Sequence, residues 1–246
     1  MRAAIVDEFG PLEAIRIGEM PAPQLKPGHV LIAVKAAGVG FVDALGAAGK
    51  YQVKQALPFV PGGEYAGIVE SVGEGVTGIA PGDRVMAGGF AGAYAEYALA
   101  PAGAVLAMPA SMSFVEAAGF RTNYATALHA LADRAAIAAG ETLLVLGAGG
   151  GTGIAAIQIG KLLGARVIAA ASSAEKRAAA LAAGADEAID YTDPAWREVL
   201  KAMTGGKGID VVFDPVGCAA TETAFRSLAW KGRHLVIGFA SGTIPA

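Results

Sequence analysis

In the segment LLVLGAGGGTGIAAIQIGK, residues 143–161, several glycines lie between an apolar run and a helical pattern. Gly147, Gly150 and Gly153 recur at every third position. Where a strand turns sharply into a helix, the first backbone N–H groups lack partners and the positive end of the helix dipole lies behind them. Glycines allow a pyrophosphate to approach that backbone closely, which predicts a dinucleotide site. Position 148 is alanine, so the plain Gly-x-Gly-x-x-Gly fingerprint is absent, and a tight structural turn is the alternative.

The end of the next apolar run predicts which dinucleotide binds. NAD sites place Asp or Glu there to bind the ribose 2′-hydroxyl. This chain instead has RVIAAASSAEKR, residues 166–177, in which Ser172 and Ser173 follow the apolar run and Lys176 and Arg177 come next. Hydroxyls and cations suit a 2′-phosphate through charge-assisted hydrogen bonds, so we expect NADP(H) rather than NAD(H). The alternative, compatible with the first, is that Ser172 or Ser173 caps the next helix and Lys176 is solvated.

Strand-like and helical patterns alternate from Leu143 onward. The apolar runs cover residues 143–147, 166–171, 187–191, 210–217 and 234–240, and the helical patterns cover 153–164, 175–184, 195–204 and 221–230. This alternation predicts parallel βαβ units in a doubly wound sheet. Glycines at positions 164, 184, 205 and 232 are expected to end the helices in the left-handed conformation.

The first half of the chain has a different pattern, with short apolar runs and few helical segments. Short apolar or alternating runs cover residues 3–9, 14–20, 29–39, 65–73, 83–89 and 95–101, with Gly and Pro between them. This spacing predicts a compact all-β barrel or sandwich. Two helical patterns follow at 111–120, where Ser111 can cap the helix, and at 126–137.

The composition limits the class of protein. A chain of 246 residues with 54% hydrophobic and 17% charged residues can bury one large or two modest cores, which argues against extensive disorder. Its net charge of −3 provides no general attraction to nucleic acid or anionic membranes. The single cysteine, Cys218, excludes an intramolecular disulfide framework and is expected to be a small buried side chain. The N-terminus lacks a signal-peptide core and no apolar run is long enough to span a membrane, so we expect a soluble, cytoplasmic protein.

Several longer stretches carry a family resemblance. They include PGHVLIAVKAAGVGFVDAL, PFVPGGEYAGIVESVGEGV, NYATALHAL, GAGGGTGIAAIQIGKLLGARVIA and VVFDPVG, in the family's order along the chain. The chain resembles the medium-chain dehydrogenase/reductase superfamily, and within it the zinc-free NADPH:quinone oxidoreductase (zeta-crystallin-like) branch. The resemblance implies a GroES-like β-barrel catalytic domain over residues 1–120, followed by a doubly wound Rossmann NADP-binding domain over 121–246. It also implies an incomplete C-terminus, because the chain stops at Ile244-Pro245-Ala246 where family members continue with a strand that commonly pairs across a homodimer.

The resemblance also assigns roles to residues. The cofactor-binding set would be Gly147, Gly150, Gly151, Thr152 and Gly153 at the pyrophosphate, Ser172, Ser173, Lys176 and Tyr191 around the 2′-phosphate, and Thr126, Gly238, Phe239 and Ala240 near the nicotinamide. Phe41, Asp43 and Tyr51 would line the substrate side. For Asp43 and Tyr51 the alternative is a strand-end carboxylate and a half-buried phenol. Gly40 stands where family members usually have a polar residue, so a hydrogen bond to substrate is lost or supplied by water.

The residues that bind catalytic zinc in other members of the superfamily are not matched here. Those enzymes use a Cys near the position of GVGFVDAL and a His in Gly-His-Glu, where this chain reads Gly62-Gly63-Glu64. His29, His129 and His234 are scattered and are interpreted as structural or surface residues, so we expect no metal site. The resemblance then implies hydride transfer from NADPH to an acceptor that is already electrophilic, a quinone or an α,β-unsaturated carbonyl, with Tyr51 as a candidate hydrogen-bond donor or water orienter.

Two other functions remain open at this point. The chain could be a non-catalytic NADPH-binding protein with a structural, sensor or crystallin-like role, as Gly40 and the early end suggest. It could also be an enoyl-thioester reductase that acts on CoA-linked or carrier-linked substrates. Binding of nucleic acid has no basic patch to support it.

Overall fold

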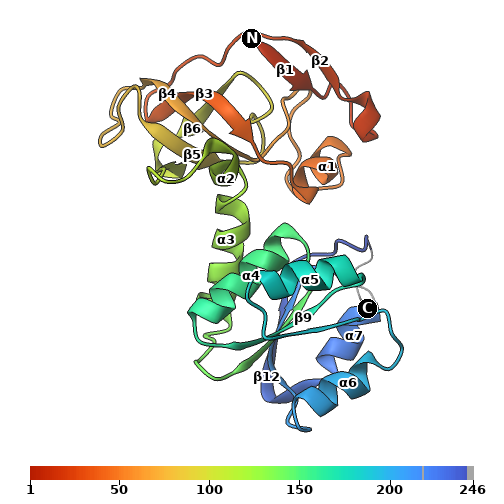
Figure 1. Cartoon of the computed structure of the whole chain (residues 1–246). Helices are drawn as coiled ribbons and strands as arrows, with labels where there is room; N and C mark the ends of the chain where they lie inside the picture. The colour runs from red at the N-terminus through yellow and green to blue at the C-terminus, as the bar shows by residue number, and fades with distance from the viewer. Residues whose placement is uncertain (218, 243–246) are drawn as a thin grey trace. The chain divides into compact units, whose positions relative to one another are not determined.

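The computed structural model describes residues 1–217 and 219–242. The chain divides into two compact units, Met1–Thr122 and a second that begins at Asn123 (Figure 1). Two features considered above, Cys218 and the chain end at Ile244-Pro245-Ala246, lie outside the described residues. Each unit has its own core and is described by itself.

The first unit is mainly β-structure. Its elements are β1 (Arg2–Ile5), η1 (Leu12–Ala14), β2 (Arg16–Glu19), β3 (His29–Ala37), α1 (Phe41–Ala47), β4 (Glu64–Val72), β5 (Arg84–Gly88), β6 (Tyr97–Pro101), η2 (Ala102–Ala104), β7 (Val105–Ala107) and α2 (Phe114–Ala118). Five strands form an antiparallel sheet in the order β6-β3-β4-β5-β7, and β1 pairs separately with β2.

The alternation of side chains across this sheet creates two apolar layers. Val30, Ile32, Val69 and Val85 point into one cluster together with small side chains of β6. Residues of the opposite face, Ala66 and Met86 among them, pack against α2. Because successive side chains of a strand point to opposite faces, the alternating sequence pattern is sufficient to specify both layers.

Two local features of this unit differ from the expectations. Helix α2 is capped by Ser113 and not by Ser111: the Ser113 hydroxyl accepts the N–H of Glu116 (3.2 Å), and the Glu116 carboxylate accepts the N–H of Ser113 (2.8 Å). This reciprocal capping box needs Glu three residues after the cap, a spacing that only Ser113 satisfies. In addition, the segment around Asp43 is not a strand end but the helix α1.

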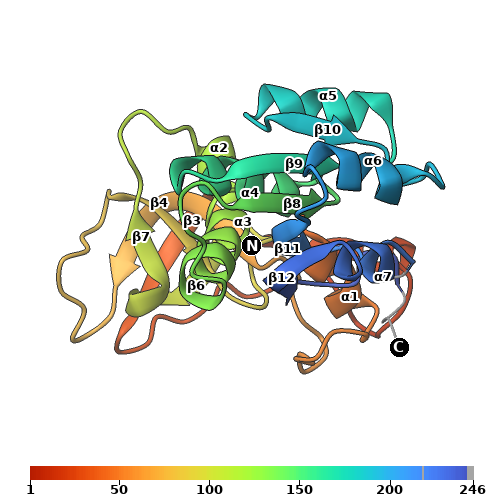
Figure 2. The ribbon, with the colours of Figure 1, turned by 90° about the horizontal axis from the view of Figure 1, so that it is seen from below.

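The second unit contains the parallel sheet. Its elements are α3 (Arg121–Leu128), which contains the boundary between the units, η3 (His129–Arg134), β8 (Thr142–Leu146), α4 (Gly151–Leu162), β9 (Arg166–Ala170), α5 (Ala174–Ala182), β10 (Glu187–Ile189), α6 (Trp196–Met203), β11 (Ile209–Asp214), α7 (Ala219–Phe225) and β12 (Leu228–Val236). All neighbouring strands are parallel, in the order β10-β9-β8-β11-β12, which Figure 2 shows from β10 at the top to β12 below.

Helices cover both faces of this sheet. Helices α4 and α5 lie on one face and α6 and α7 on the other (Figure 1). Leu143 and Val145 of β8 pack on the side of α4 and α5, whereas Leu144 and Leu146 pack on the side of α6 and α7. Since both faces are buried, the strand has a continuous apolar run in place of an alternating one. The expected doubly wound arrangement of five parallel strands is therefore present.

The last expected helix and strand have different bounds. Helix α7 ends at Phe225, and β12 already begins at Leu228, which pairs with Ile209 of β11. Gly232 consequently lies inside a strand and caps no helix. The glycines at 164, 184 and 205 do follow helix ends with φ of +82°, +108° and +58°, as expected.

The helix expected over residues 126–137 also differs. It starts earlier, at Arg121, and continues into the π-helix η3, where the Ala135 N–H bonds to the carbonyl of Ala130 (2.9 Å). Its start is fixed by Glu64, whose carboxylate accepts the N–H of Thr122 (2.9 Å). Burial raises the pKa of the Glu64 carboxyl, although the hydrogen bonds from Thr122 and Arg121 oppose this effect. A cap 58 residues away in the sequence could not be predicted from local pattern.

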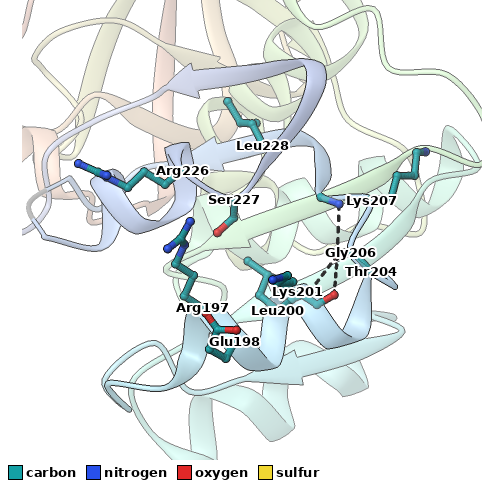
Figure 3. A pocket seen from close by; sticks show the side chains of 11 residues that line it. Arg197, Glu198, Leu200, Lys201, Thr204, Gly206, Lys207, Arg226, Ser227 and Leu228 are labelled. Atoms are coloured by element: carbon teal, nitrogen blue, oxygen red, sulfur yellow. Dashed lines mark hydrogen bonds between the residues drawn. The ribbon is translucent and has the colours of Figure 1, made fainter.

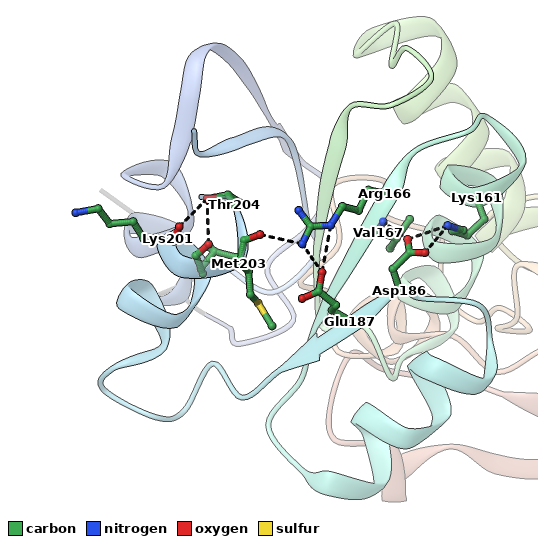
Figure 4. A network of polar contacts seen from close by, with 9 residues as sticks. Lys161, Arg166, Val167, Asp186, Glu187, Lys201, Met203 and Thr204 are labelled. Carbon is green, nitrogen blue, oxygen red and sulfur yellow. Dashed lines mark hydrogen bonds and ion pairs between the residues drawn. The ribbon is translucent and has the colours of Figure 1, made fainter. Parts of the chain in front are cut away.

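A polar network joins the amino end of β9 to its neighbours (Figure 4). Arg166 forms an ion pair with Glu187 of β10 and donates to the carbonyl of Met203 (2.9 Å) at the end of α6. That carbonyl is one of the last four of its helix, which have no intrahelical donor. Beside it, Asp186 accepts from Lys161 (2.7 Å) and from the N–H of Val167 (2.7 Å). The network thus fixes the edge of the sheet opposite to the glycine turn.

Candidate functional site

The turn between β8 and α4 has the geometry of an anion cradle. Gly147 follows β8 with φ of +59°, and Gly150 is the extended residue before α4, with φ of −89° and ψ of 163°. Glycine has no side chain with which to cap the helix, so the first N–H groups of α4 depend on another acceptor. The positive end of the helix dipole adds to their attraction for a negative group, and a phosphate fits this donor set.

Close backbone contacts explain why glycines occupy this turn. A Cβ on Gly153 would lie 2.4 Å from the Gly147 carbonyl oxygen and 2.9 Å from the Ala148 Cα. A Cβ on Gly147 would lie 2.9 Å from a methyl carbon of Val216, in addition to the strain of its positive φ. The helix can therefore approach the strand closely enough to present its amino end only because these side chains are absent.

Lys176 lies against the glycine turn. A Cβ on Gly149 would be 2.6 Å from the Lys176 Cβ, so the stem of the lysine crosses the backbone of the turn and its ammonium end is exposed. Ser173 is the N-cap of α5 and accepts the N–H of Lys176 (3.3 Å), as one of the interpretations above expected. No carboxylate follows β9 before α5; half-buried Ser172 and Ser173 stand there.

Arg177 has a different role from Lys176. Its guanidinium donates to the carbonyl of Ala171 (3.0 Å) and to the carboxylate of Asp190 (2.8 Å). The arginine therefore ties the start of α5 to the end of β10, and its charge is already paired. Of the two cations that the sequence offered for a 2′-phosphate, the structure leaves Lys176 as the candidate.

Tyr191 follows β10 and packs half-buried against the cluster that contains Trp196 and Leu200. Among the described residues, no hydrogen bond or ring contact joins it to Ser172, Ser173 or Lys176. Its expected place around the 2′-phosphate stays a prediction.

The residues expected beside the nicotinamide follow β12. The N–H of Gly238 bonds to the carbonyl of Asp214 (3.3 Å), and the N–H of Ala240 bonds to the carbonyl of Pro215 (3.0 Å). Half-buried Phe239 lies between them in the chain. This segment therefore runs beside the loop after β11, and that loop also contacts Gly147 through Val216. Residues 238–240 and the glycine turn therefore both contact the loop that follows β11.

A buried carboxylate that sequence reasoning did not single out organises that loop. Asp214 accepts hydrogen bonds from the N–H groups of Val216 and Gly217 (2.9 Å each), from the hydroxyl of Thr221 (2.5 Å) and from Nε2 of His234 (3.2 Å). Burial disfavours its charged form, but these four donors outweigh burial and lower the pKa of Asp214. The available signal in the sequence was an acidic residue at the end of a buried apolar strand.

Thr126 lies on α3 beside β12. It lines a cavity of about 400 Å³ together with His129, Ala130 and Arg134 of the helical segment and with residues 234–237 of the strand and the position after it. The described contacts do not join Thr126 to Gly238, Phe239 or Ala240. Its expected place near the nicotinamide stays a prediction.

Asp43 has three hydrogen-bond donors in the first unit. Its carboxylate accepts the N–H of Gly40 (2.7 Å), the N–H of Gly63 (2.9 Å) and the hydroxyl of Tyr94 (2.9 Å). It therefore caps α1 and joins that helix to the loop before β4. Burial, together with the hydrogen bond and the charge of Asp43, raises the pKa of Tyr94 well above its usual range. These contacts are structural, and a catalytic role for Asp43 stays a prediction.

The other two candidates for the substrate side, Phe41 and Tyr51, have fewer contacts than Asp43. Phe41 is the first residue of α1, and 54% of its surface is exposed. Tyr51 is half-buried, and its ring centroid lies 6.5 Å from that of Phe90. No hydrogen bond of its hydroxyl is present among the described residues.

The described residues contain no group of three or more His, Cys, Asp or Glu side chains that could hold a metal ion. The position of a zinc-binding histidine in Gly-His-Glu is Gly63, and the next residue, Glu64, is already used to cap α3. Across residues 1–217 and 219–242, no helix is both long and apolar enough to cross a membrane.

A second cavity lies at the opposite, amino end of the parallel sheet (Figure 3). It measures about 230 Å³, and its lining includes Arg197, Lys201, Lys207 and Arg226. Both α6 and α7 end here, so cations are expected beside the negative ends of the helix dipoles. Moreover, Lys207 pairs with Asp210 (3.3 Å) and Arg226 pairs with Glu222 (2.7 Å). Three of these cations, Lys201, Lys207 and Arg226, lie at or just after the carboxyl ends of α6 and α7, which accounts for them. The cavity lies away from the edge where ligands of parallel sheets bind.

Two family models match the chain, one in each unit. A model described as the alcohol dehydrogenase GroES-like domain matches residues 26–110, and one described as zinc-binding dehydrogenase matches residues 151–246. The expected fold class, a GroES-like domain followed by a Rossmann-type parallel sheet, is thereby confirmed.

Known proteins resemble this chain over its full length. It is 39% identical to quinone oxidoreductase-like protein 2 of Bos taurus, over 100% of this chain and 70% of that protein. A mycobacterial protein solved in complex with NADPH superposes with a TM-score of 0.94 at 37% identity, over 100% of this chain and 76% of the other. The quinone oxidoreductase of Escherichia coli, also solved with NADPH, superposes with a TM-score of 0.94 at 32% identity, again over 100% and 76%.

Replacement of Gly153 by Ala should destabilise the second unit. The added Cβ would collide with backbone atoms that cannot move without displacing β8 or α4, and overpacking of this kind costs about 1–3 kcal/mol. Both tryptophans, Trp196 and Trp230, belong to this unit, so urea unfolding followed by tryptophan fluorescence measures the effect. Gly150→Ala is the matched control, because its Cβ would lie 3.4 Å from the nearest atom. Equal unfolding midpoints for the two variants would contradict the argument.

Asp43→Asn should lower the thermal stability of the first unit. An amide has one acceptor oxygen, and its NH₂ would face an N–H or O–H donor, which costs about 1–3 kcal/mol. Calorimetry measures the change, with Asp83→Asn as control because Asp83 is exposed and accepts only the N–H of Ala80 among the described residues. Lost turnover with unchanged stability would instead assign Asp43 to the chemistry.

Proposed function

This chain belongs to the quinone oxidoreductase branch of the medium-chain dehydrogenase/reductase superfamily, and we propose that it is an NADPH-dependent oxidoreductase that reduces a quinone or an α,β-unsaturated carbonyl compound. The arrangement at the end of β9 carries the cofactor proposal. No carboxylate stands there to bind a ribose 2′-hydroxyl, and the stem of the exposed Lys176 lies against the glycine turn. This combination of an anion cradle and a neighbouring cation suits a dinucleotide with a 2′-phosphate.

The residues of the second unit would bind the cofactor in parts. The turn from Gly147 to Gly153 would hold the pyrophosphate on backbone N–H groups, and Ser172, Ser173 and Lys176 would hold the 2′-phosphate. The loop fixed by Asp214 would support the segment Gly238–Ala240 beside the nicotinamide. NADPH, when bound, supplies the hydride. The protein then contributes orientation of the reacting groups and exclusion of water.

The choice of acceptor follows from the side chains on the substrate side. The Asp43 carboxylate already accepts hydrogen bonds from three donors of the protein. The hydroxyl of Tyr51 could donate to the acceptor oxygen as negative charge develops there. With Gly63 at the position of the zinc-binding histidine, the acceptor should be electrophilic without a metal. Quinones and enones meet this requirement.

A homodimer and a cytoplasmic location are further parts of the proposal. The first is an implication of the family resemblance, and light scattering of the purified protein tests it. Fractionation of the source cells tests the second.

Turnover is the direct test of the proposed activity. The protein should oxidise NADPH in the presence of 9,10-phenanthrenequinone, 1,2-naphthoquinone or a 2-alkenal, and a chelator should leave the rate unchanged. Absorbance at the nicotinamide band measures the reaction. Preference for a CoA-linked enoyl substrate would indicate an enoyl-thioester reductase, and tight NADPH binding with no turnover on any acceptor would indicate a non-catalytic role.

The cofactor choice has its own test in Lys176→Glu. The variant should weaken NADPH binding at least tenfold and leave NADH binding nearly unchanged, because only NADPH has the 2′-phosphate that the new carboxylate repels. Fluorescence titration with both dinucleotides measures the two affinities. Lys201→Glu, on the exposed side of α6 at the opposite end of the sheet, is the charge-matched control. An equal effect on the two dinucleotides would remove Lys176 from the 2′-phosphate site.

A further inference from the structure

The side chain of Asn123, from the first turns of α3, lies against the amino end of α4. A Cβ on Gly151 would be 3.0 Å from its Nδ2 and 3.3 Å from its Oδ1, so the carboxamide covers the Cα of the first helical residue. The hydroxyl of Thr152 donates to Oδ1 over 2.8 Å in a partly buried contact. Asn123 therefore contacts Gly151 and Thr152, the first two residues of α4, which lie 28 and 29 positions further along the chain.

This contact determines what the turn can offer to an anion. The single hydroxyl proton of Thr152 is directed at Asn123, so the Thr152 side chain cannot donate it to a phosphate at the same time. Backbone N–H groups remain as the donors of the turn. Their arrangement depends on the first turn of α4, which the hydrogen bond between Thr152 and Asn123 holds in place.

The charge of the side chain at position 123 should matter as well. A carboxylate there could still accept the Thr152 hydroxyl, and it would stabilise the positive end of the helix dipole. The same carboxylate would lie beside the backbone that faces the phosphates and would repel them. Asp at position 123 should therefore stabilise the fold at least as well as Asn does. Binding of an anion, in contrast, requires the neutral Asn.

We propose that Asn123 is a positioning residue for the pyrophosphate of the dinucleotide. Its hydrogen bond with Thr152 holds the first turn of α4 in place, and its neutral side chain adds no negative charge beside the phosphates. The inference rests on the proposed function. The pyrophosphate is common to NADPH and NADH, so position 123 affects both, whereas Lys176 distinguishes between them.

Asn123→Asp in the full chain tests this role. The dissociation constants of NADPH and NADH should both rise about tenfold and by the same factor, as expected for a unit charge roughly 5 Å from a phosphate in a partly exposed site. The melting temperature should stay the same or rise. Increasing salt should reduce the loss of affinity because the repulsion is screened. Ala202→Glu, on the exposed side of α6, is a control for added charge in the same unit.

Each outcome bears on the proposal. Unchanged affinity for both dinucleotides in Asn123→Asp would overturn it, as would a loss confined to NADPH, which would place position 123 at the 2′-phosphate. If that variant fails to fold, Thr152→Val removes the hydroxyl that Asn123 holds and should weaken both dinucleotides by one common factor; unchanged binding would again overturn the proposal. A wild-type chain that binds neither dinucleotide would refute the proposed function, and this inference with it.

Discussion

The close approach of α4 to the end of β8 is the constraint on which the ligand-binding edge of the second unit depends. Only a hydrogen atom fits at the Cα of Gly153, because a Cβ there would be 2.4 Å from the carbonyl oxygen of Gly147. This packing directs the amino end of α4 toward the carboxyl edge of the sheet. The missing side chains of Gly147 and Gly149 leave room for Val216 from the loop after β11 and for the stem of Lys176 from α5. Three segments from different parts of the chain thus meet around one turn.

Three carboxylates hold the other loops that matter for the site, with Glu64 and Asp214 buried and Asp43 half-buried. Asp43, Glu64 and Asp214 each accept backbone N–H groups, at α1, at α3 and after β11 respectively. In Glu64 and Asp214 the balance between burial, which raises the pKa, and hydrogen-bond donors, which lower it, differs. At Glu64 burial dominates and raises the pKa, whereas at Asp214 four donors outweigh burial and lower it. These three acidic side chains therefore hold backbone segments of the fold in place.

The limits of local pattern are visible in the elements whose partners are distant. The expected helix over 221–230 gives way to β12 at Leu228, because this segment completes the sheet beside β11. The helix expected from residue 126 begins at Arg121, with Glu64 accepting the N–H of Thr122 at its start. Asp43, for which a strand-end carboxylate was the structural alternative, lies in α1 and accepts the N–H of Gly63 and the hydroxyl of Tyr94. In each case the deciding contact spans at least 19 positions of sequence, beyond any window over which periodicity is read.

What the sequence determined by itself was the succession of apolar runs, helices and glycines, since hydrophobic period and backbone freedom are properties of neighbouring residues. That succession was sufficient to predict the parallel sheet, the glycine turn and the absence of a carboxylate after the second strand. Only the tertiary structure decided how side chains are shared between elements. It pairs Arg177 with Asp190 and leaves Lys176 over the turn, and it places Asn123 against the start of α4. Such choices depend on distances between segments, which exist only once the chain has folded.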